Sequence, residues 1–73
     1  MNTRIAGNII KRLREKKGLS QEVLSGLADI NRSYLSRVEL GKSSPSLEVL
    51  YRLADALDVK MSDMLREIEK ETK

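Results

Sequence analysis

Cysteine and histidine are absent from this sequence, and so are phenylalanine and tryptophan. Without cysteine the chain can form neither a disulfide framework nor a thiolate metal site. There is also no glycine-rich phosphate loop and no activated nucleophile, so an enzyme is the least favoured class of function. We expect no metal, no cofactor and no small-molecule ligand. No apolar run approaches the roughly 18 residues of a membrane-spanning helix, and no secretory signal is recognisable, which favours a cytoplasmic protein.

The chain is short, and its apolar residues are almost all aliphatic. A chain of 73 residues predicts one domain, spanning 1–73, with a single small core. A domain of this size buries only about 60% of its unfolded surface, which leaves little room for a pocket. Aromatic residues make up 3% of the sequence, both of them tyrosines, so leucine, isoleucine, valine and alanine must form the core.

Charge is distributed unevenly along the chain. The net charge is only +3, but residues 1–17 hold six cations and one acid, whereas residues 46–73 hold five cations and seven acids. A basic N-terminal segment and a mildly acidic C-terminal segment fit a molecule that turns one face toward a polyanion. Ordinary solvated helix surfaces would give the same distribution, so charge alone does not decide between the two interpretations.

Five segments carry apolar residues at the 3.6-residue period of a helix, and none alternates with the two-residue period of a strand. The sequence therefore predicts an all-α, compact five-helix domain. The helices are expected at about residues 3–17, 20–28, 31–40, 46–57 and 62–70. The expected N-caps are Ser20, Asn31, Ser46 and Ser62. Glycine follows the first and third helices at Gly18 and Gly41.

Each helix is expected to turn one apolar face inward. In the first helix this face contains Ala6, Ile9, Ile10 and Leu13. In the second it contains Val23, Leu24, Leu27 and Ala28. In the fourth it contains Leu47, Leu50, Leu53, Ala54 and Leu57, and in the last Met64, Leu65 and Ile68.

The helix at 31–40 has a polar face without any acid. Arg32, Ser33, Ser36 and Arg37 fall on this face, opposite the apolar positions. A solvated helix face usually mixes charges of both signs. Arginine can donate in a fork to guanine O6 and N7, and serine is short enough to let a helix approach bases. The face therefore favours the DNA major groove over a plain exposed surface.

The helices at 20–28 and 31–40 are separated by a break at residues 29–31, which is the spacing of a helix-turn-helix. In that motif the N-terminus of the first helix meets the sugar–phosphate backbone, where free N–H groups bind anions. Ser20 and Gln21 occupy this end. Lys42 and Ser43 follow the second helix, at another natural position for phosphate contacts.

At this point the sequence resembles the phage repressor and Cro type of helix-turn-helix domain, the xenobiotic-response-element family. The resemblance rests on "LSQE", "YLSRVELGK", "PSLEVLYRLADAL" and "DML" together, and it covers roughly residues 4–68. It implies a lambda repressor-like fold and a transcriptional regulator that binds double-stranded DNA in a sequence-specific manner. It further implies a symmetric homodimer on a palindromic operator. The "NRSY" segment is similar to the controller proteins of restriction–modification systems.

The sequence departs from the family pattern at two positions and matches it at another pair. Ser25 stands where a small alanine is usual, and Asp29 stands where the turn usually has glycine. Serine is still small, and aspartate tolerates a left-handed conformation better than most residues. Arg14 and Glu39 match the positions of an ion pair that joins the first and third helices in the family.

These considerations assign a role to each candidate site residue. DNA base contacts are expected from Arg32, Ser33, Ser36, Arg37 and Gln21, with phosphate binding as the alternative for each arginine. DNA phosphate contacts are expected from Ser20, Tyr34, Lys42, Ser43 and Arg12, with core packing as the alternative for Tyr34 and an ordinary solvated position as the alternative for Arg12. A structural ion pair is expected between Arg14 and Glu39. A dimer interface is expected at Val49, Ala56, Met64, Leu65 and Ile68, unless these residues only close the core.

A protein-interaction module is the main competing interpretation. Some helix-turn-helix domains bind partner proteins, and antitoxins combine partner binding with DNA binding. The acid-free face of the helix at 31–40 favours DNA, whereas weak salt dependence of DNA binding would favour a partner protein. RNA is disfavoured because the aromatic stacking platforms of common RNA-binding modules are missing.

Overall fold

The computed structural model describes residues 2–72, which form five α-helices. The helices are α1 (Thr3–Lys16), α2 (Gln21–Ala28), α3 (Arg32–Glu39), α4 (Leu47–Ala56) and α5 (Met61–Glu71). Every helix begins and ends within one residue of the predicted bound, so the all-α, five-helix prediction is confirmed. Across the described residues, no helix combines the length and the apolar character needed to cross a membrane.

Three of the four predicted N-caps are present. The Ser20 hydroxyl accepts a hydrogen bond from the Val23 N–H at 3.1 Å, and the Ser46 hydroxyl accepts one from the Val49 N–H at 3.1 Å. The Asn31 side-chain carbonyl accepts from the Ser33 N–H at 2.8 Å. Each cap satisfies a backbone donor that would otherwise have no partner at the helix start.

The predicted N-cap of the last helix is wrong. α5 begins at Met61, and its N-cap is Lys60, which makes no side-chain capping bond. The Lys60 backbone is extended (φ −71°, ψ 137°), and its carbonyl already accepts from the N–H groups of Asp63 and Met64. Ser62 therefore lies inside the first turn, where its hydroxyl has no cap position to fill.

Residues with a left-handed backbone follow the first four helices. Gly18 and Gly41 have φ values of 73° and 76°. Asp29, the C-cap of α2, adopts φ 56° and ψ 48°, and Asp58 after α4 has a φ of 58°. The turn between α2 and α3 thus keeps its left-handed geometry without glycine, at a conformational cost that aspartate bears better than most residues.

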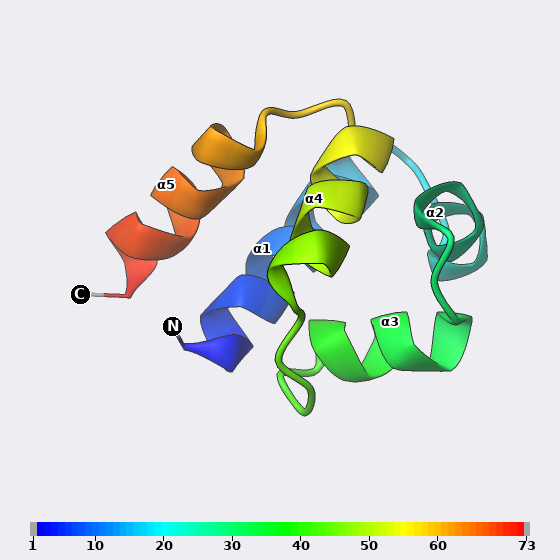
Figure 1. Ribbon diagram of the computed structural model, residues 1–73, viewed down its shortest axis with the longest axis horizontal. Coiled ribbons are helices and arrows are strands. Elements are labelled where there is room, and N and C mark those ends of the chain that lie inside the picture. Colours follow the sequence, from blue (N-terminus) through cyan, green and yellow to red (C-terminus); the bar gives the residue numbers. More distant parts are fainter. Residues whose placement is uncertain (1, 73) are drawn as a thin grey trace.

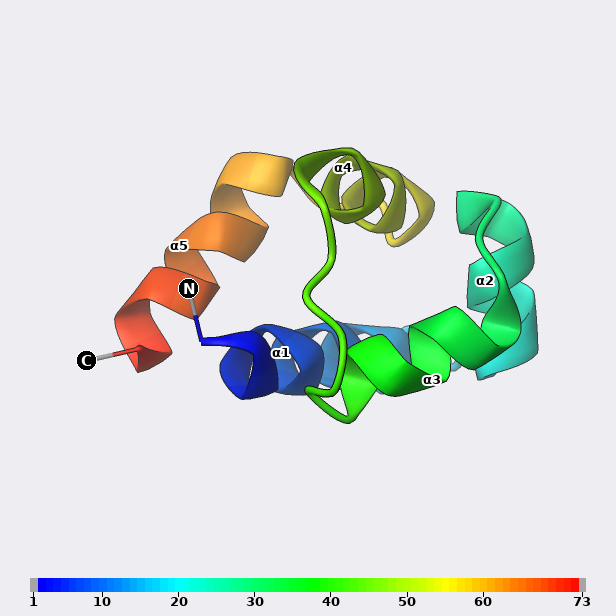
Figure 2. The same cartoon turned by 60° about the horizontal axis from the view of Figure 1, so that its bottom comes forward.

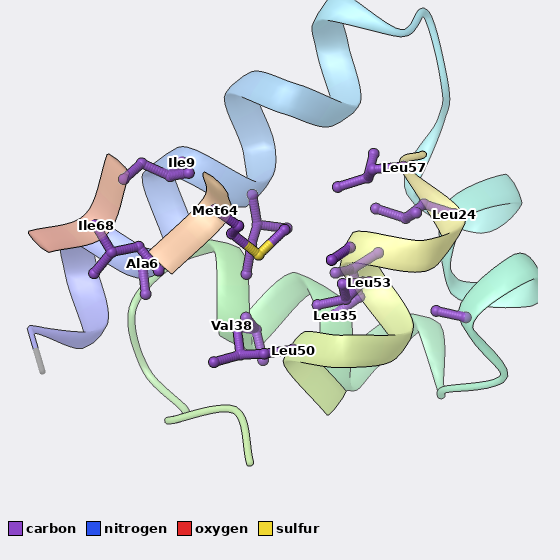
Figure 3. Packing of buried hydrophobic residues seen from close by; sticks show 13 residues of the cluster. Ala6, Ile9, Leu24, Leu35, Val38, Leu50, Leu53, Leu57, Met64 and Ile68 are labelled. Carbon is purple, nitrogen blue, oxygen red and sulfur yellow. The ribbon is translucent and has the colours of Figure 1, made fainter. Parts of the chain in front are cut away.

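The core is aliphatic, as predicted, and all five helices contribute to it (Figure 3). Ile9 and Ile10 enter from α1, Leu24 from α2 and Leu35 from α3. The remaining large side chains from α3, α4 and α5, with Leu57 just after α4, are Val38, Leu50, Leu53, Leu57, Met64 and Ile68. Their burial is the main favourable term in the stability of such a small domain.

Four residues predicted to face inward are instead exposed. Val23 and Leu27 of α2 remain 47% and 60% exposed, and Leu47 at the start of α4 and Leu65 of α5 are also exposed. The buried side of α2 is formed by Leu24, Ser25 and Ala28, because α3 and α4 both pack there. Ser25 is thus buried, although the apolar pattern alone placed Val23 and Leu27 on the buried side of α2.

α1 and α3 pack closely side by side on one face of the molecule, with α4 on the opposite side and α2 at one end (Figures 1 and 2). Gly7 makes this approach possible. A Cβ atom at Gly7 would overlap the Val38 carbonyl oxygen and would lie 2.8 Å from that of Glu39. α5 turns back and lies against α1 and α4.

Candidate DNA interface

The turn between α2 and α3 holds the two helices in fixed orientation. The N–H groups of Asp29 and Ile30 donate to the carbonyls of Gly26 and Ser25 at 3.2 and 3.0 Å. Ser25 is buried, and its hydroxyl donates to the Glu22 carbonyl at 3.0 Å, so the serine at this position is fully accommodated. The helix-turn-helix predicted from the spacing is thus formed by α2, residues 29–31 and α3.

The outer face of α3 carries the predicted base-contact residues. Arg32, Ser33 and Arg37 are exposed, and Ser36 is half-buried. Leu35 and Val38 point into the core on the other side of the helix, which fixes the outward direction of this face. In residues 2–72 no ion pair involves Arg32 or Arg37, so both guanidinium groups are available to a ligand.

Tyr34 lies at the edge of the same face. It is half-buried, packs against the core and has the Arg37 guanidinium 5.9 Å from its ring centroid. This cation–π contact limits the directions in which Arg37 can extend. Asn31, one turn earlier, uses its side-chain oxygen to cap α3 and is therefore a structural residue.

Arg14 and Glu39 form the ion pair that the family resemblance implied. The guanidinium donates from Nε to Oε2 at 2.7 Å and from Nη2 to Oε1 at 3.0 Å. Their side chains are only 11% and 2% exposed. The hydrogen bond to Glu39 raises the pKa of Arg14 above its ordinary value. Nη1 of Arg14 also donates to the Leu19 carbonyl at 2.8 Å, so α1, the start of α2 and the end of α3 are joined.

Gln21 belongs to this network. Its Nε2 atom donates to Glu39 Oε1 at 2.9 Å. For Gln21 to donate through this hydrogen to a base, the bond to Glu39 has to break. The amide nitrogen carries a second hydrogen, which remains available for a phosphate at the N-terminus of α2. This second hydrogen can equally donate to a base, as predicted for Gln21.

The predicted phosphate contacts separate into two groups. Ser20, Lys42 and Ser43 flank α3 at the N-terminus of α2 and in the loop after Gly41. Arg12 lies apart from them, because it donates to both carboxylate oxygens of Glu71 in α5 at 2.8 and 3.2 Å. This contact raises the pKa of Arg12 and lowers that of Glu71. The fold therefore turns Arg12 toward α5 and away from α3.

Three residues of α1 that the sequence did not single out lie beside α3. Arg4, Asn8 and Lys11 line an open hollow together with Ser36 and Leu40 of α3. Their spacing of four and three residues places them on one helix face. That spacing was a signal available in the sequence, but nothing in it showed that α3 lies alongside.

The predicted dimer residues differ widely in exposure. Met64 and Ile68 are only 1% and 3% exposed and belong to the core, so they have almost no surface to offer a partner subunit. Val49 and Ala56 are half-buried, and Leu65 is 37% exposed. Of the α5 residues in the predicted interface, only Leu65 presents substantial apolar surface.

The helix-turn-helix family HTH_3 matches residues 10–64. Control protein C.MunI from a Mycoplasma species is 41% identical over 66 residues, which cover 89% of each chain. This chain belongs to the HTH_3 family. It is a DNA-binding regulator of the Cro/C1 type, and the family is one of transcriptional regulators rather than enzymes.

Solved structures agree with this membership. The restriction–modification controller protein C.AhdI from Aeromonas hydrophila is 39% identical, with a TM-score of 0.83 over 85% of this chain and 94% of its own. The clp gene regulator ClgR from C. glutamicum is 25% identical, with a TM-score of 0.91 over 100% of this chain and 95% of its own. The lambda repressor-like, five-helix fold predicted from the sequence is therefore confirmed.

Proposed function

We propose that this HTH_3 protein binds a palindromic operator in double-stranded DNA as a homodimer, with α3 of each subunit in the major groove. Its output is the regulation of transcription, and its likeness to two controller proteins supports this role. Each subunit reads one half-site, so the two recognition helices of the dimer lie about 34 Å apart, one turn of the duplex.

The observation that carries the proposal is the outer face of α3. Arg32, Ser33 and Arg37 are exposed on it, and the one acid of α3, Glu39, is buried and paired with Arg14. A guanidinium placed this way can donate two hydrogen bonds to guanine, and each such pair discriminates by about 1–3 kcal/mol. Ser36 is the next candidate for a base contact, because it lies on the same face.

Phosphate contacts orient α3 in the groove. Ser20 and Gln21 at the N-terminus of α2 bind one strand with the help of the helix dipole. Lys42 and Ser43 follow α3, and the Tyr34 hydroxyl lies at the edge of the face. These groups position the protein without reading sequence.

Dimerisation is supported by size. A domain of 31 × 23 × 21 Å makes too few base contacts to select one site in a genome. Leu65 on α5, with Val49 and Ala56 on α4, forms the proposed interface. Substitution of Leu65 by glutamate places a charge in this interface without entering the core. We expect sedimentation equilibrium to show L65E as a monomer under conditions where the parent protein is a dimer. A dimeric L65E would place the interface elsewhere.

The function is tested by selecting bound sites from a random duplex library with the purified protein. We expect a palindrome with guanines in each half-site, bound by two chains. For each bound subunit, Arg37→Ala is expected to weaken binding to the selected site by roughly 5- to 150-fold, while binding to unrelated DNA changes much less. Lys60→Ala is the matched control, because Lys60 is an exposed cation between α4 and α5. Selection that yields no preferred sequence would overturn the proposal.

One observation supports binding to a partner protein as a second candidate function. Val23 and Leu27 project from α2 on the side that neither α3 nor α4 covers. Exposed apolar side chains one helical turn apart are suited to contact with another protein. Binding of a partner that is abolished by Leu27→Glu, in a variant that still binds the operator, would establish this role beside DNA binding.

A further inference from the structure

A row of polar side chains on α1 borders the recognition helix. Arg4, Asn8 and Lys11 line an open hollow of about 400 Å³ whose other walls come from α2 and α3. The residues on those walls are Gln21, Ser36, Glu39 and Leu40. Two cations and an amide thus stand directly beside the face of α3 that we assign to base contacts.

The only acid of this hollow does not repel an anion. Glu39 Oε1 accepts hydrogen bonds from Arg14 Nη2 and Gln21 Nε2, and Oε2 accepts from Arg14 Nε. Arg14 balances the charge of the carboxylate, and all three bonds occupy its oxygens. The charges of Arg4 and Lys11 therefore set the sign of the local potential.

Arg4 and Lys11 are exposed, and neither takes part in an ion pair within residues 2–72. Arg12, their neighbour on α1, differs from them because Glu71 of α5 binds it. Arg12 and Arg14 of α1 are thus paired within the protein, whereas Arg4 and Lys11 face outward beside α3.

The row continues the proposed phosphate-binding loop. The Gly41 backbone lies against Arg4, since a Cβ atom at Gly41 would be 2.8 Å from Arg4 Cα. The Thr3 hydroxyl donates to the Gly41 carbonyl at 3.1 Å and holds the loop to α1. Lys42 follows Gly41 directly, so the chain places a third cation next to the row that begins with Arg4 and Lys11.

We propose that Arg4 and Lys11, with Asn8 between them, bind phosphates of the DNA strand that borders the groove entered by α3. Seven residues of helix separate the two cations by about 10 Å along the axis, so each meets a different phosphate. The Asn8 amide can donate to a phosphate oxygen between them. The proposal rests on the proposed function, and it extends the DNA contacts from the helix-turn-helix to α1.

The test is a salt titration of operator and unrelated duplex with the double variant Arg4→Gln/Lys11→Gln. Each phosphate contact accounts for a slope of about −0.9 in log K against log salt, or about a 3.5-fold change in affinity between 50 and 200 mM. For each bound subunit, the affinity of the parent protein should therefore fall about 12-fold more over this salt range than the affinity of the double variant. The loss is expected on both duplexes, because phosphate contacts do not read sequence.

The matched control is Lys16→Gln/Lys70→Gln, which removes the same charge from surfaces that do not line this hollow. Circular dichroism checks that both double variants are folded. A double variant of Arg4 and Lys11 that titrates like the control overturns the proposal for α1, even where Arg37→Ala still abolishes sequence preference. A parent protein that binds no duplex overturns the proposed function and this inference together.

Discussion

Arg14 of α1 holds Glu39 of α3 by two parallel hydrogen bonds of 2.7 and 3.0 Å, in a pair that is almost entirely removed from solvent. Gln21 of α2 completes the pair by donating to the same carboxylate. Three helices meet at one charged group, at the edge of the face proposed to contact bases. The relationship links the stability of the domain to the orientation of its recognition helix.

Replacing Glu39 by alanine should destabilise the domain strongly, because it leaves a nearly buried guanidinium without a counter-charge. We expect a loss of about 3 kcal/mol in the free energy of unfolding, measured by urea denaturation. Glu71→Gln is the control, since it breaks a solvent-exposed pair with Arg12 and should change stability little. Equal effects of the two substitutions would show that the buried pair stabilises the domain no more than the exposed pair does.

Two glycines should respond to alanine with opposite signs. Gly7→Ala places a methyl group against the backbone carbonyls of Val38 and Glu39, so α1 and α3 must separate. We expect a loss of about 1–3 kcal/mol. Gly26→Ala meets no atom within 4 Å and improves helix propensity, so it should gain about 0.5–1 kcal/mol. Thermal unfolding of both variants decides the signs, and a stabilising Gly7→Ala would contradict the close helix contact.

Replacing Asp29 by glycine should stabilise the domain. Its left-handed backbone is strained for an L-residue, and its negative charge lies at the C-terminal end of α2, where the helix dipole disfavours it. We expect Asp29→Gly to stabilise the domain by about 1 kcal/mol and Asp29→Val to destabilise it. The midpoint of urea unfolding measures both changes. A destabilising Asp29→Gly would mean that the aspartate makes a contribution beyond its backbone conformation.

The pair between Arg12 and Glu71 predicts a pH dependence. The hydrogen bond from Arg12 lowers the pKa of Glu71 in the folded state. A lowered folded-state pKa contributes stability above the unfolded-state pKa, and this contribution disappears as pH falls through the folded-state value. NMR titration should find Glu71 below its ordinary pKa, and Arg12→Gln should return it toward that value. An unchanged Glu71 pKa in Arg12→Gln would exclude Arg12 as the cause.

High salt should reduce this shift as well, because both side chains are solvent-exposed and salt screens their attraction. The titration repeated at 1 M salt is therefore an internal control for the electrostatic part of the effect.

Local chemistry in the sequence was sufficient to place the helices. Ser20, Asn31 and Ser46 cap α2, α3 and α4 because their short side chains reach the free N–H groups of the first turn. Gly18 and Gly41 end α1 and α3 with a left-handed backbone. These signals act within a few residues and do not depend on what packs nearby. The prediction failed only at Ser62, where the backbone of Lys60 begins the helix without a side-chain cap.

The site was predicted in part. The opposition between Leu35 and Val38 on one side of α3 and Arg32, Ser33 and Arg37 on the other follows from helical periodicity alone. The pairing of Arg14 with Glu39 was implied by the family resemblance and is present. The placement of Arg12 was not foreseeable, because a long side chain on α1 can turn to either of two flanking helices.

The order of residues within single helices and turns was enough to predict five helices, three of their N-caps, an aliphatic core and an acid-free face on α3. Which apolar residues are covered depends instead on tertiary packing, which leaves Val23 and Leu27 exposed and buries Met64 and Ile68. It also set Arg4 and Lys11, rather than Arg12, beside the recognition helix. Periodicity defines the faces of a helix, but burial and ion pairing depend on which neighbouring helix lies against each face.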